Sequence, residues 1–221
     1  MLYTPLFANR TDAGEKLAQK IHTLLRLQTS ASGVKPVPIV YALPRGGLPV
    51  AAPVARLLGC PLSVIVAKKI SHPQNPELAI GAVTASGHVL WTGQNAFRRF
   101  KYLQSRQEVL NTAIDKAKSL EAQLSPACPD VNAEGATVIL VDDGIATGMT
   151  IAVAAIAVRD LSPKEVWLCT PLAPLKLLPW LNQWCDRAIV LETPEPFLSV
   201  SNFYVEFPQV ETTEAILYLQ Q

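Results

Sequence analysis

Two adjacent carboxylates, Asp142 and Asp143, follow directly on an apolar run in the stretch VILVDDGIATGMT, residues 138–150. Two like charges a few ångströms apart disfavour each other's ionisation, so a chain that keeps them usually has a ligand or a cation that offsets the cost. The small residues after them lead into a predicted helix start, where backbone N–H groups can bind an anion. The stretch therefore predicts a phosphate-binding loop with two carboxylates beside it.

The small residues after the acid pair are the candidate phosphate ligands, because glycine allows close approach of the backbone and threonine adds a hydroxyl. Neither GxxxxGK[ST] nor GxGxxG, two common phosphate-loop patterns, occurs in the chain. Acids beside a phosphate suit a sugar phosphate, whose vicinal hydroxyls donate to carboxylates; the alternative is that the acids only cap the next helix. The candidates are Gly144, Ala146, Thr147, Gly148, Met149 and Thr150.

Two further segments carry residues that could bind an anion: Pro44-Arg45-Gly46-Gly47 and Lys68-Lys69. Each follows a predicted strand, and ligands of open α/β sheets bind beyond the carboxyl ends of the strands. An arginine offers a planar fork of donors, and glycines leave backbone amides accessible. An ordinary tight turn is the alternative for the first segment, and a surface role is the alternative for each lysine.

Strands and helices alternate along the chain before and after a central region whose sequence pattern differs. Asp12 and Glu15 form a capping-box pattern before a helical periodicity, and the strands are nearly all apolar, as expected when both faces of a parallel sheet are covered. The pattern predicts an α/β fold with a Rossmann-like central parallel sheet and helices on both faces. The predicted helices cover about 12–28, 48–58, 149–160 and 173–183, and the predicted strands cover 37–43, 62–67, 137–141, 165–170 and 187–191.

The central region, about residues 70–130, is predicted to be an excursion from the sheet within a single domain of residues 1–221. Two half-apolar runs in 77–91 flank Ala85-Ser86-Gly87, which is typical of a hairpin. Residues 95–124 form the longest polar stretch with helical character, and 125–135 is a loop rich in proline and alanine.

Composition excludes several classes of function. The chain has 221 residues, of which 49% are hydrophobic and 17% charged, and a net charge of +1, which argues against nucleic-acid and membrane-surface binders. Four scattered cysteines without a CxxC pair argue against zinc and disulfides and favour reduced thiols. No signal peptide or membrane helix is evident, so we expect a cytoplasmic protein.

The stretch at 138–150 resembles the phosphoribosyl-pyrophosphate signature of the type I phosphoribosyltransferases across all thirteen positions, with Gly144 where many members carry an aliphatic residue. The segments FANRTDAGEKLA, ALPRGGLPVA, NPELAIGAV, VDDGIATG and NFYVEFPQV are together similar to one branch of that superfamily, and they span nearly the whole chain. Relatives in this branch often have Arg-Lys where this chain has Lys68-Lys69.

This resemblance implies a reaction and a site. A nitrogen nucleophile would displace pyrophosphate from C1 of ribose, with Mg²⁺ held mainly through the substrate rather than by direct protein ligands. The resemblance implies that Asp142 and Asp143 hold the ribose hydroxyls, that the loop after them holds the 5′-phosphate, and that the 77–91 hairpin closes over the site. It also implies that the pyrophosphate ligands are Arg45, Gly46 and Gly47, together with Lys68 or Lys69.

The acceptor is left open, although a nucleobase or related compound is expected. Phe203 and Tyr204 are candidates for stacking on it, and packing of the C-terminal segment onto the core is the alternative. The superfamily also suggests a homodimer. A non-catalytic sensor that keeps the pocket, and a metal-dependent phosphohydrolase that uses the acid pair, are the rival functions.

Overall fold

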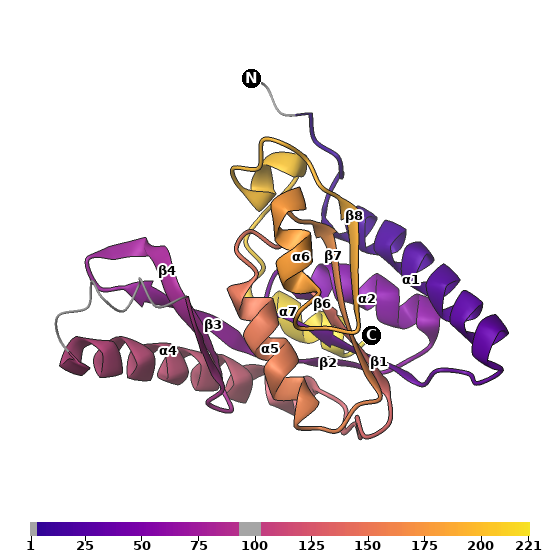
Figure 1. The fold of residues 1–221 in the computed structure, drawn as a ribbon, viewed down its shortest axis with the longest axis horizontal. Helices are drawn as coiled ribbons and strands as arrows, with labels where there is room; N and C mark the ends of the chain where they lie inside the picture. Colours follow the sequence, from indigo (N-terminus) through magenta and orange to yellow (C-terminus); the bar gives the residue numbers. More distant parts are fainter. Residues whose placement is uncertain (1–3, 93–102) are drawn as a thin grey trace.

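A computed structural model describes residues 4–92 and 103–221, and its centre is a five-stranded parallel sheet (Figure 1). The strand order is β2-β1-β6-β7-β8, and every neighbouring pair runs parallel. The α/β fold with a central parallel sheet is therefore confirmed. The strands are β1 (Pro38–Ala42), β2 (Leu62–Val64), β6 (Thr137–Val141), β7 (Glu165–Leu172) and β8 (Arg187–Glu192).

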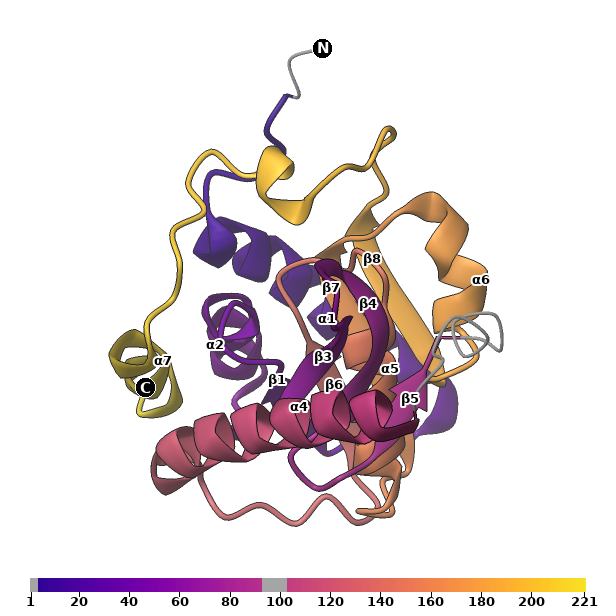
Figure 2. The same cartoon turned by 90° about the vertical axis from the view of Figure 1, so that its left-hand side faces the viewer.

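Helices cover both faces of this sheet, which explains why its strands are apolar throughout. Side chains alternate along β6: Ile139 and Val141 pack with α1 (Arg10–Ser32), α2 (Gly47–Leu58) and α7 (Thr212–Leu219), whereas Val138 and Leu140 pack with α5 (Met149–Arg159). Figure 2 shows α2 and α7 on one side of the strands and α5 and α6 (Leu178–Leu181) on the other.

A second, antiparallel sheet of three strands lies beside the first and was predicted only in part. The expected hairpin is present as β4 (Asn75–Thr84) and β5 (Val89–Trp91), but β4 also pairs with β3 (Ala67–His72). The helix α4 (Leu103–Leu124) crosses these strands (Figure 2), while residues 95–102 of the predicted helix lie outside the described residues.

The position of β3 corrects the prediction of one strand over 62–67 with Lys68 and Lys69 in the loop after it. The central-sheet strand ends at Val64, and both lysines lie inside β3. β2 is the edge strand of its sheet, so the chain leaves it there and forms a new ladder with β4.

The first helix begins earlier than the capping pattern at Asp12 predicted. Its N-cap is Asn9, whose side-chain oxygen accepts the N–H of Asp12 over 3.0 Å, while Asp12 Oδ2 accepts the N–H of Ala8 over 3.0 Å. This exchange of hydrogen bonds is a capping arrangement shifted by three residues. Arg10 consequently occupies the first turn of α1.

The C-terminal third also differs from the prediction. The helix expected over 173–183 is a 3₁₀ turn (Leu175–Leu177) followed by the single turn of α6, and α7 was not predicted. Another 3₁₀ turn (Val200–Phe203) leads to a segment that pairs with the N-terminal segment: Phe7 N–H donates to Phe203 O and Val205 N–H donates to Phe7 O. No helix among the described residues is long and apolar enough to cross a membrane.

Candidate functional site

Two loops meet at the carboxyl edge of the parallel sheet because the strands before them are neighbours. β1 pairs with β6, so residues 43–46 lie beside residues 142–148, and the Leu43 N–H donates to Val141 O over 2.9 Å. Between the loops is a cavity of about 380 Å³. It is lined by Arg10, Leu43, Pro44, Arg45, Gly46, Ala67, Lys68, Asp142, Asp143, Thr150, Gln209 and Val210.

The contact between the two loops requires glycine at two positions. A Cβ at Gly47 would lie 2.7 Å from the carbonyl oxygen of Val141, and a Cβ at Gly46 would overlap the carboxylate of Asp143. The Pro44–Arg45 peptide bond in the same loop is cis. The glycines therefore let the arginine-containing loop pack directly against the acid pair.

The acid pair is held by groups from both ends of the chain. Arg10 Nε–H donates to Asp143 Oδ2 over 2.7 Å, and the hydroxyl of Tyr204 donates to the Asp143 carbonyl oxygen over 2.6 Å. The Asp143 N–H donates to Asp142 Oδ1 over 2.9 Å. The pair is thus fixed by the backbone and by the guanidinium of Arg10.

Burial dominates the electrostatics of both acids. Burial and the neighbouring charge of Asp143 raise the pKa of Asp142 well above its ordinary range. Burial also raises the pKa of Asp143, although Arg10 acts in the opposite direction. Acids that line a cavity and have a pKa shifted by burial and by neighbouring charges are frequent in functional sites.

The candidate phosphate loop ends at the start of α5. Gly148 has φ +78°, a left-handed conformation that favours glycine, and a Cβ there would overlap the ring of Trp180. The first N–H groups of α5 have no partner within the helix, which suits an anion. Ala146 and Thr147 are exposed and Thr150 lines the cavity, whereas the Met149 side chain is buried in the core, so Met149 could contribute only its backbone.

Of the three cations predicted to bind pyrophosphate, two line the cavity. Arg45 and Lys68 line it, whereas Lys69 is not among the lining residues, because consecutive residues of a strand point to opposite faces. Arg45 Nη1–H donates to Thr212 Oγ1 over 3.0 Å and lies 3.6 Å from Glu211 Oε2. Burial, followed by the charges of Arg45 and Lys116, lowers the pKa of Lys68.

The two aromatic residues predicted as candidates for stacking on the acceptor instead pack onto the core, which was the alternative. Phe203 and Tyr204 are 3% and 4% exposed, pack with Phe7, and are not among the residues that line the cavity. Their faces are therefore covered by protein, and stacking on an acceptor is not compatible with this arrangement.

Sequence reasoning missed Arg10, Gln209 and Val210 as cavity residues. Arg10 lies in the quoted segment FANRTDAGEKLA, but nothing near it in the chain points to its partner 133 positions away. Gln209 and Val210 lie at the end of NFYVEFPQV, in an irregular segment without periodicity.

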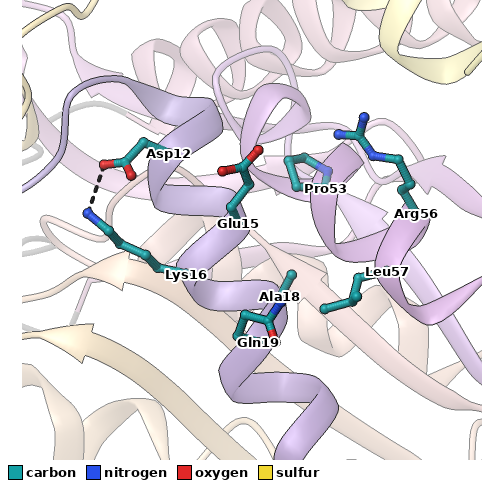
Figure 3. Close-up of a pocket in the computed structure, with 8 residues that line it drawn as sticks. All are labelled: Asp12, Glu15, Lys16, Ala18, Gln19, Pro53, Arg56 and Leu57. Atoms are coloured by element: carbon teal, nitrogen blue, oxygen red, sulfur yellow. Dashed lines mark hydrogen bonds and ion pairs between the residues drawn. The ribbon is translucent and has the colours of Figure 1, made fainter.

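A larger cavity of about 580 Å³ lies between α1 and α2 (Figure 3). It is lined by Asp12, Glu15 and Lys16 of α1 and by Arg56 of α2, and Asp12 pairs with Lys16 over 2.9 Å. None of the predicted site residues lines this cavity.

The fold is that of an α/β protein with a central parallel sheet, and comparison with known proteins identifies its family. The family model described as "Phosphoribosyl transferase domain" matches residues 8–186, so the chain belongs to the phosphoribosyltransferase family.

Three known proteins are similar to this chain over nearly its whole length. Two curated proteins of Mycobacterium tuberculosis strains, named "Putative phosphoribosyl transferase MT0597" and "Putative phosphoribosyl transferase Rv0571c", are each 31% identical over 230 residues and cover 98% of this chain. The chain spans about half the length of these relatives, 47% in each case. The crystal structure of TT1426 from Thermus thermophilus is 30% identical, has a TM-score of 0.76 and covers 97% of both chains.

Proposed function

We propose that this chain binds 5-phosphoribosyl-1-pyrophosphate and transfers the phosphoribosyl group to a nitrogenous acceptor, with release of pyrophosphate. The observation that carries the proposal is the meeting of two loops in one cavity. The loop after β1 supplies Arg45 and Gly46, and the loop after β6 supplies Asp142 and Asp143, with Thr150 from the helix start beyond it. Those groups match the three parts of the donor: pyrophosphate, ribose hydroxyls and 5′-phosphate.

Each loop has a separate task in this reaction. The N–H groups at the start of α5 and the hydroxyls of Thr147 and Thr150 bind the 5′-phosphate. Arg45, Lys68 and the amides of Gly46 and Gly47 bind the pyrophosphate. The carboxyl groups of Asp142 and Asp143 accept hydrogen bonds from the ribose hydroxyls and favour positive charge on the ring, which develops as the bond from C1 to the pyrophosphate oxygen breaks. The acceptor nitrogen then forms the new bond to C1 and loses its proton.

Magnesium fits this site as a metal that is held mainly through the substrate. Among the described residues no group of three or more histidines, cysteines or acids could form a protein cage for it. Asp142 and Asp143 are two hard oxygen donors next to the place proposed for the ribose, which suits a cation shared with ribose and pyrophosphate oxygens. When bound, Mg²⁺ would neutralise charge on the leaving pyrophosphate.

Several features remain part of this proposal. The hairpin of β4 and β5 is proposed to close over the bound donor and exclude water. The acceptor is proposed to be a nucleobase or a related compound, which would place the protein in nucleotide metabolism or nucleoside salvage. A cytoplasmic location and a homodimer are proposed as well.

Calorimetry with phosphoribosyl pyrophosphate and Mg²⁺ tests the donor assignment. We expect the unmodified protein to bind, and the double variant Asp142→Asn/Asp143→Asn to bind at least about tenfold more weakly, since charge-assisted hydrogen bonds to the ribose are lost. Glu15→Gln is the matched control, because Glu15 is an exposed acid in the α1–α2 cavity (Figure 3). Equal binding by the double variant and the unmodified protein would refute the assignment.

Pyrophosphate release across a panel of acceptor bases separates the enzyme from a sensor. Release with one acceptor, and loss of that release in Arg45→Ala, is the expected result. Tight donor binding without release for every acceptor would favour a non-catalytic, donor-binding regulatory protein.

A further inference from the structure

The segment of residues 207–212 contacts both arginines that line the cavity beside the acid pair. The carbonyl oxygen of Pro208 accepts the Nη1–H of Arg10 over 2.7 Å, and the hydroxyl oxygen of Thr212 accepts the Nη1–H of Arg45 over 3.0 Å. The family model ends at residue 186, so the matched part of the chain does not include this segment. Part of the support of the cavity therefore comes from outside the region that defines the family.

The position of Thr212 is set by the packing of α7 on α2. Ala215 and Leu219 of α7 belong to one buried cluster together with Val210, which precedes the helix, and with the buried side chains of α2. α2 begins directly after the loop that carries Arg45. Because α7 packs on the helix that follows this loop, Thr212 is fixed relative to Arg45.

Arg45 benefits from such a contact because its side chain is long and 27% of it is exposed. An unrestrained arginine has many rotamers, and a ligand that orders them loses binding free energy. The Thr212 hydroxyl uses one of the five N–H groups of the guanidinium and leaves its charge unneutralised. The remaining N–H groups are thus available to an anion in the cavity.

Glu211 does not hold Arg45 in the same way. One carboxylate oxygen of Glu211 lies 3.6 Å from Arg45 Nη1, and the other accepts the Nε2–H of Gln209 over 3.0 Å. A separation of 3.6 Å is too long for a hydrogen bond, and 64% of the Glu211 side chain is exposed, so water screens the ion pair. Within residues 4–92 and 103–221, Thr212 is the residue whose side chain accepts a hydrogen bond from Arg45.

We propose that Thr212 is a positioning residue that holds the guanidinium of Arg45 in place for an anionic ligand, so that the segment of residues 207–212 completes the anion-binding part of the cavity. The identity of this anion as pyrophosphate rests on the proposed function. The fixation of Arg45 does not, so it is tested first on the ligand-free protein.

NMR of the arginine guanidinium groups in the ligand-free protein tests the fixation of Arg45. Rotation about the Nε–Cζ bond exchanges Nη1 with Nη2, so a hydrogen bond at Nη1 slows this rotation. We expect the rotation to be about fivefold faster in Thr212→Val, which has a similar shape but no hydroxyl, and to stay slow in Thr212→Ser, which keeps the hydroxyl. An unchanged rate in Thr212→Val would overturn the proposal.

Thr213→Val is the matched control. Thr213 is the next residue of α7, is exposed, and is not among the residues that line the cavity. This variant should leave both the rotation of Arg45 and the binding of pyrophosphate unchanged, and chemical denaturation should show that both valine variants fold. Equal effects of the two valine substitutions would show that the hydroxyl of Thr212 has no special role, and would contradict the proposal.

Calorimetry with inorganic pyrophosphate and Mg²⁺ tests the consequence for binding. Thr212→Val should bind about fivefold more weakly than the unmodified protein, because the ligand must then order the Arg45 side chain, and Thr212→Ser should bind nearly as well as the unmodified protein. In an Arg45→Ala background the same valine substitution should have no further effect, because the residue that Thr212 positions is gone. Equal losses in both backgrounds would show that Thr212 acts independently of Arg45, which would refute the positioning role.

The two measurements separate this proposal from the proposed function. If the unmodified protein binds no pyrophosphate but the rotation of Arg45 depends on Thr212, the donor assignment fails and the positioning of Arg45 stands. If pyrophosphate binds and its affinity does not depend on Thr212, the donor assignment stands and the role of Thr212 is wrong.

Discussion

Asp142 and Asp143 are adjacent in the chain, yet the folded protein gives them different partners. Asp143 contacts the buried guanidinium of Arg10, whereas the carboxylate of Asp142 makes no ion pair within the described residues and accepts the N–H of Asp143. Removal of the Asp143 charge leaves the buried Arg10 without its partner, whereas removal of the Asp142 charge removes a carboxylate that has no ion-pair partner within the described residues. The two residues are therefore not equivalent for stability, even where both are needed for binding.

Asp142→Asn should raise the free energy of unfolding of the ligand-free protein by about 1 kcal/mol at neutral pH. Because the pKa of Asp142 is raised on folding, this residue stabilises the folded state only below the ordinary carboxyl pKa and lowers stability as pH rises through the folded value. The gain in the variant should accordingly disappear below about pH 4. Chemical denaturation at both pH values measures it.

Asp143→Asn should have the opposite effect and lower the free energy of unfolding at neutral pH by about 2 kcal/mol, because Arg10 stays buried and loses a charge-assisted hydrogen bond. Denaturation under the same conditions measures this loss. Changes of the same sign in the two variants would contradict the difference in surroundings described above.

The parallel sheet places the site by bringing together the loops that follow the neighbouring strands β1 and β6. α5 begins at Met149, after the loop that follows β6, and its N-cap Gly148 packs against Trp180 of α6. The left-handed conformation and the ring leave no space for a side chain. The helix start that is proposed to bind the 5′-phosphate thus depends on one glycine.

Gly148→Ala should lower the free energy of unfolding and weaken binding of the proposed donor about tenfold, because a shift of the backbone by a fraction of an ångström misplaces the N–H groups. Gly33→Ala is the control: Gly33 has φ +69°, but a Cβ there would contact nothing within 4 Å. It should show only the conformational cost of about 1 kcal/mol and unchanged donor binding. Equal effects in both variants would show that the contact with Trp180 is unimportant.

The sequence predicted the elements whose signal is local. β1, β6 and the glycine loops were predictable because buried parallel strands are continuous apolar runs that end at conspicuous residues. β3 was missed because Lys68 and Lys69 interrupt its apolar pattern and its partner β4 lies on the far side of a turn. α6 was predicted as too long because the apolar residues of 173–183 begin before its single turn, where the chain forms the 3₁₀ turn Leu175–Leu177 instead.

At the scale of the whole molecule, both end segments of the chain contact the acid pair. Phe7 pairs with Tyr204, Arg10 stacks on Phe207, and the two segments share a cluster of buried aromatic side chains. This part of the site was not predictable from the sequence, because Arg10 and Tyr204 meet the pair across 133 and 61 positions. Local motifs predicted the loops after β1 and β6, whereas only the folded structure shows that Arg10 and Tyr204 hold the acid pair.

Tyr204→Phe tests this long-range support. Loss of the hydroxyl that donates to the Asp143 carbonyl should cost about 1 kcal/mol of stability and weaken donor binding, because the acid pair is less restrained. Tyr218→Phe is the control, since its hydroxyl reaches Glu214 at 3.4 Å in an exposed position. Paired denaturation and calorimetry should show a loss of binding only in Tyr204→Phe, and a loss in neither variant would refute the support.

The contact of Gly148 with Trp180 also provides an optical signal. The Trp180 ring lies against the loop proposed to bind phosphate and 5.6 Å from the ring of Trp184, whereas Trp167 is fully buried in the sheet and donates to Glu165. The intrinsic fluorescence of the protein should therefore change when the donor orders this loop, and the change should be absent in Trp180→Phe. Unlabelled protein would then report occupancy of the donor site in stopped-flow mixing, before any acceptor is known.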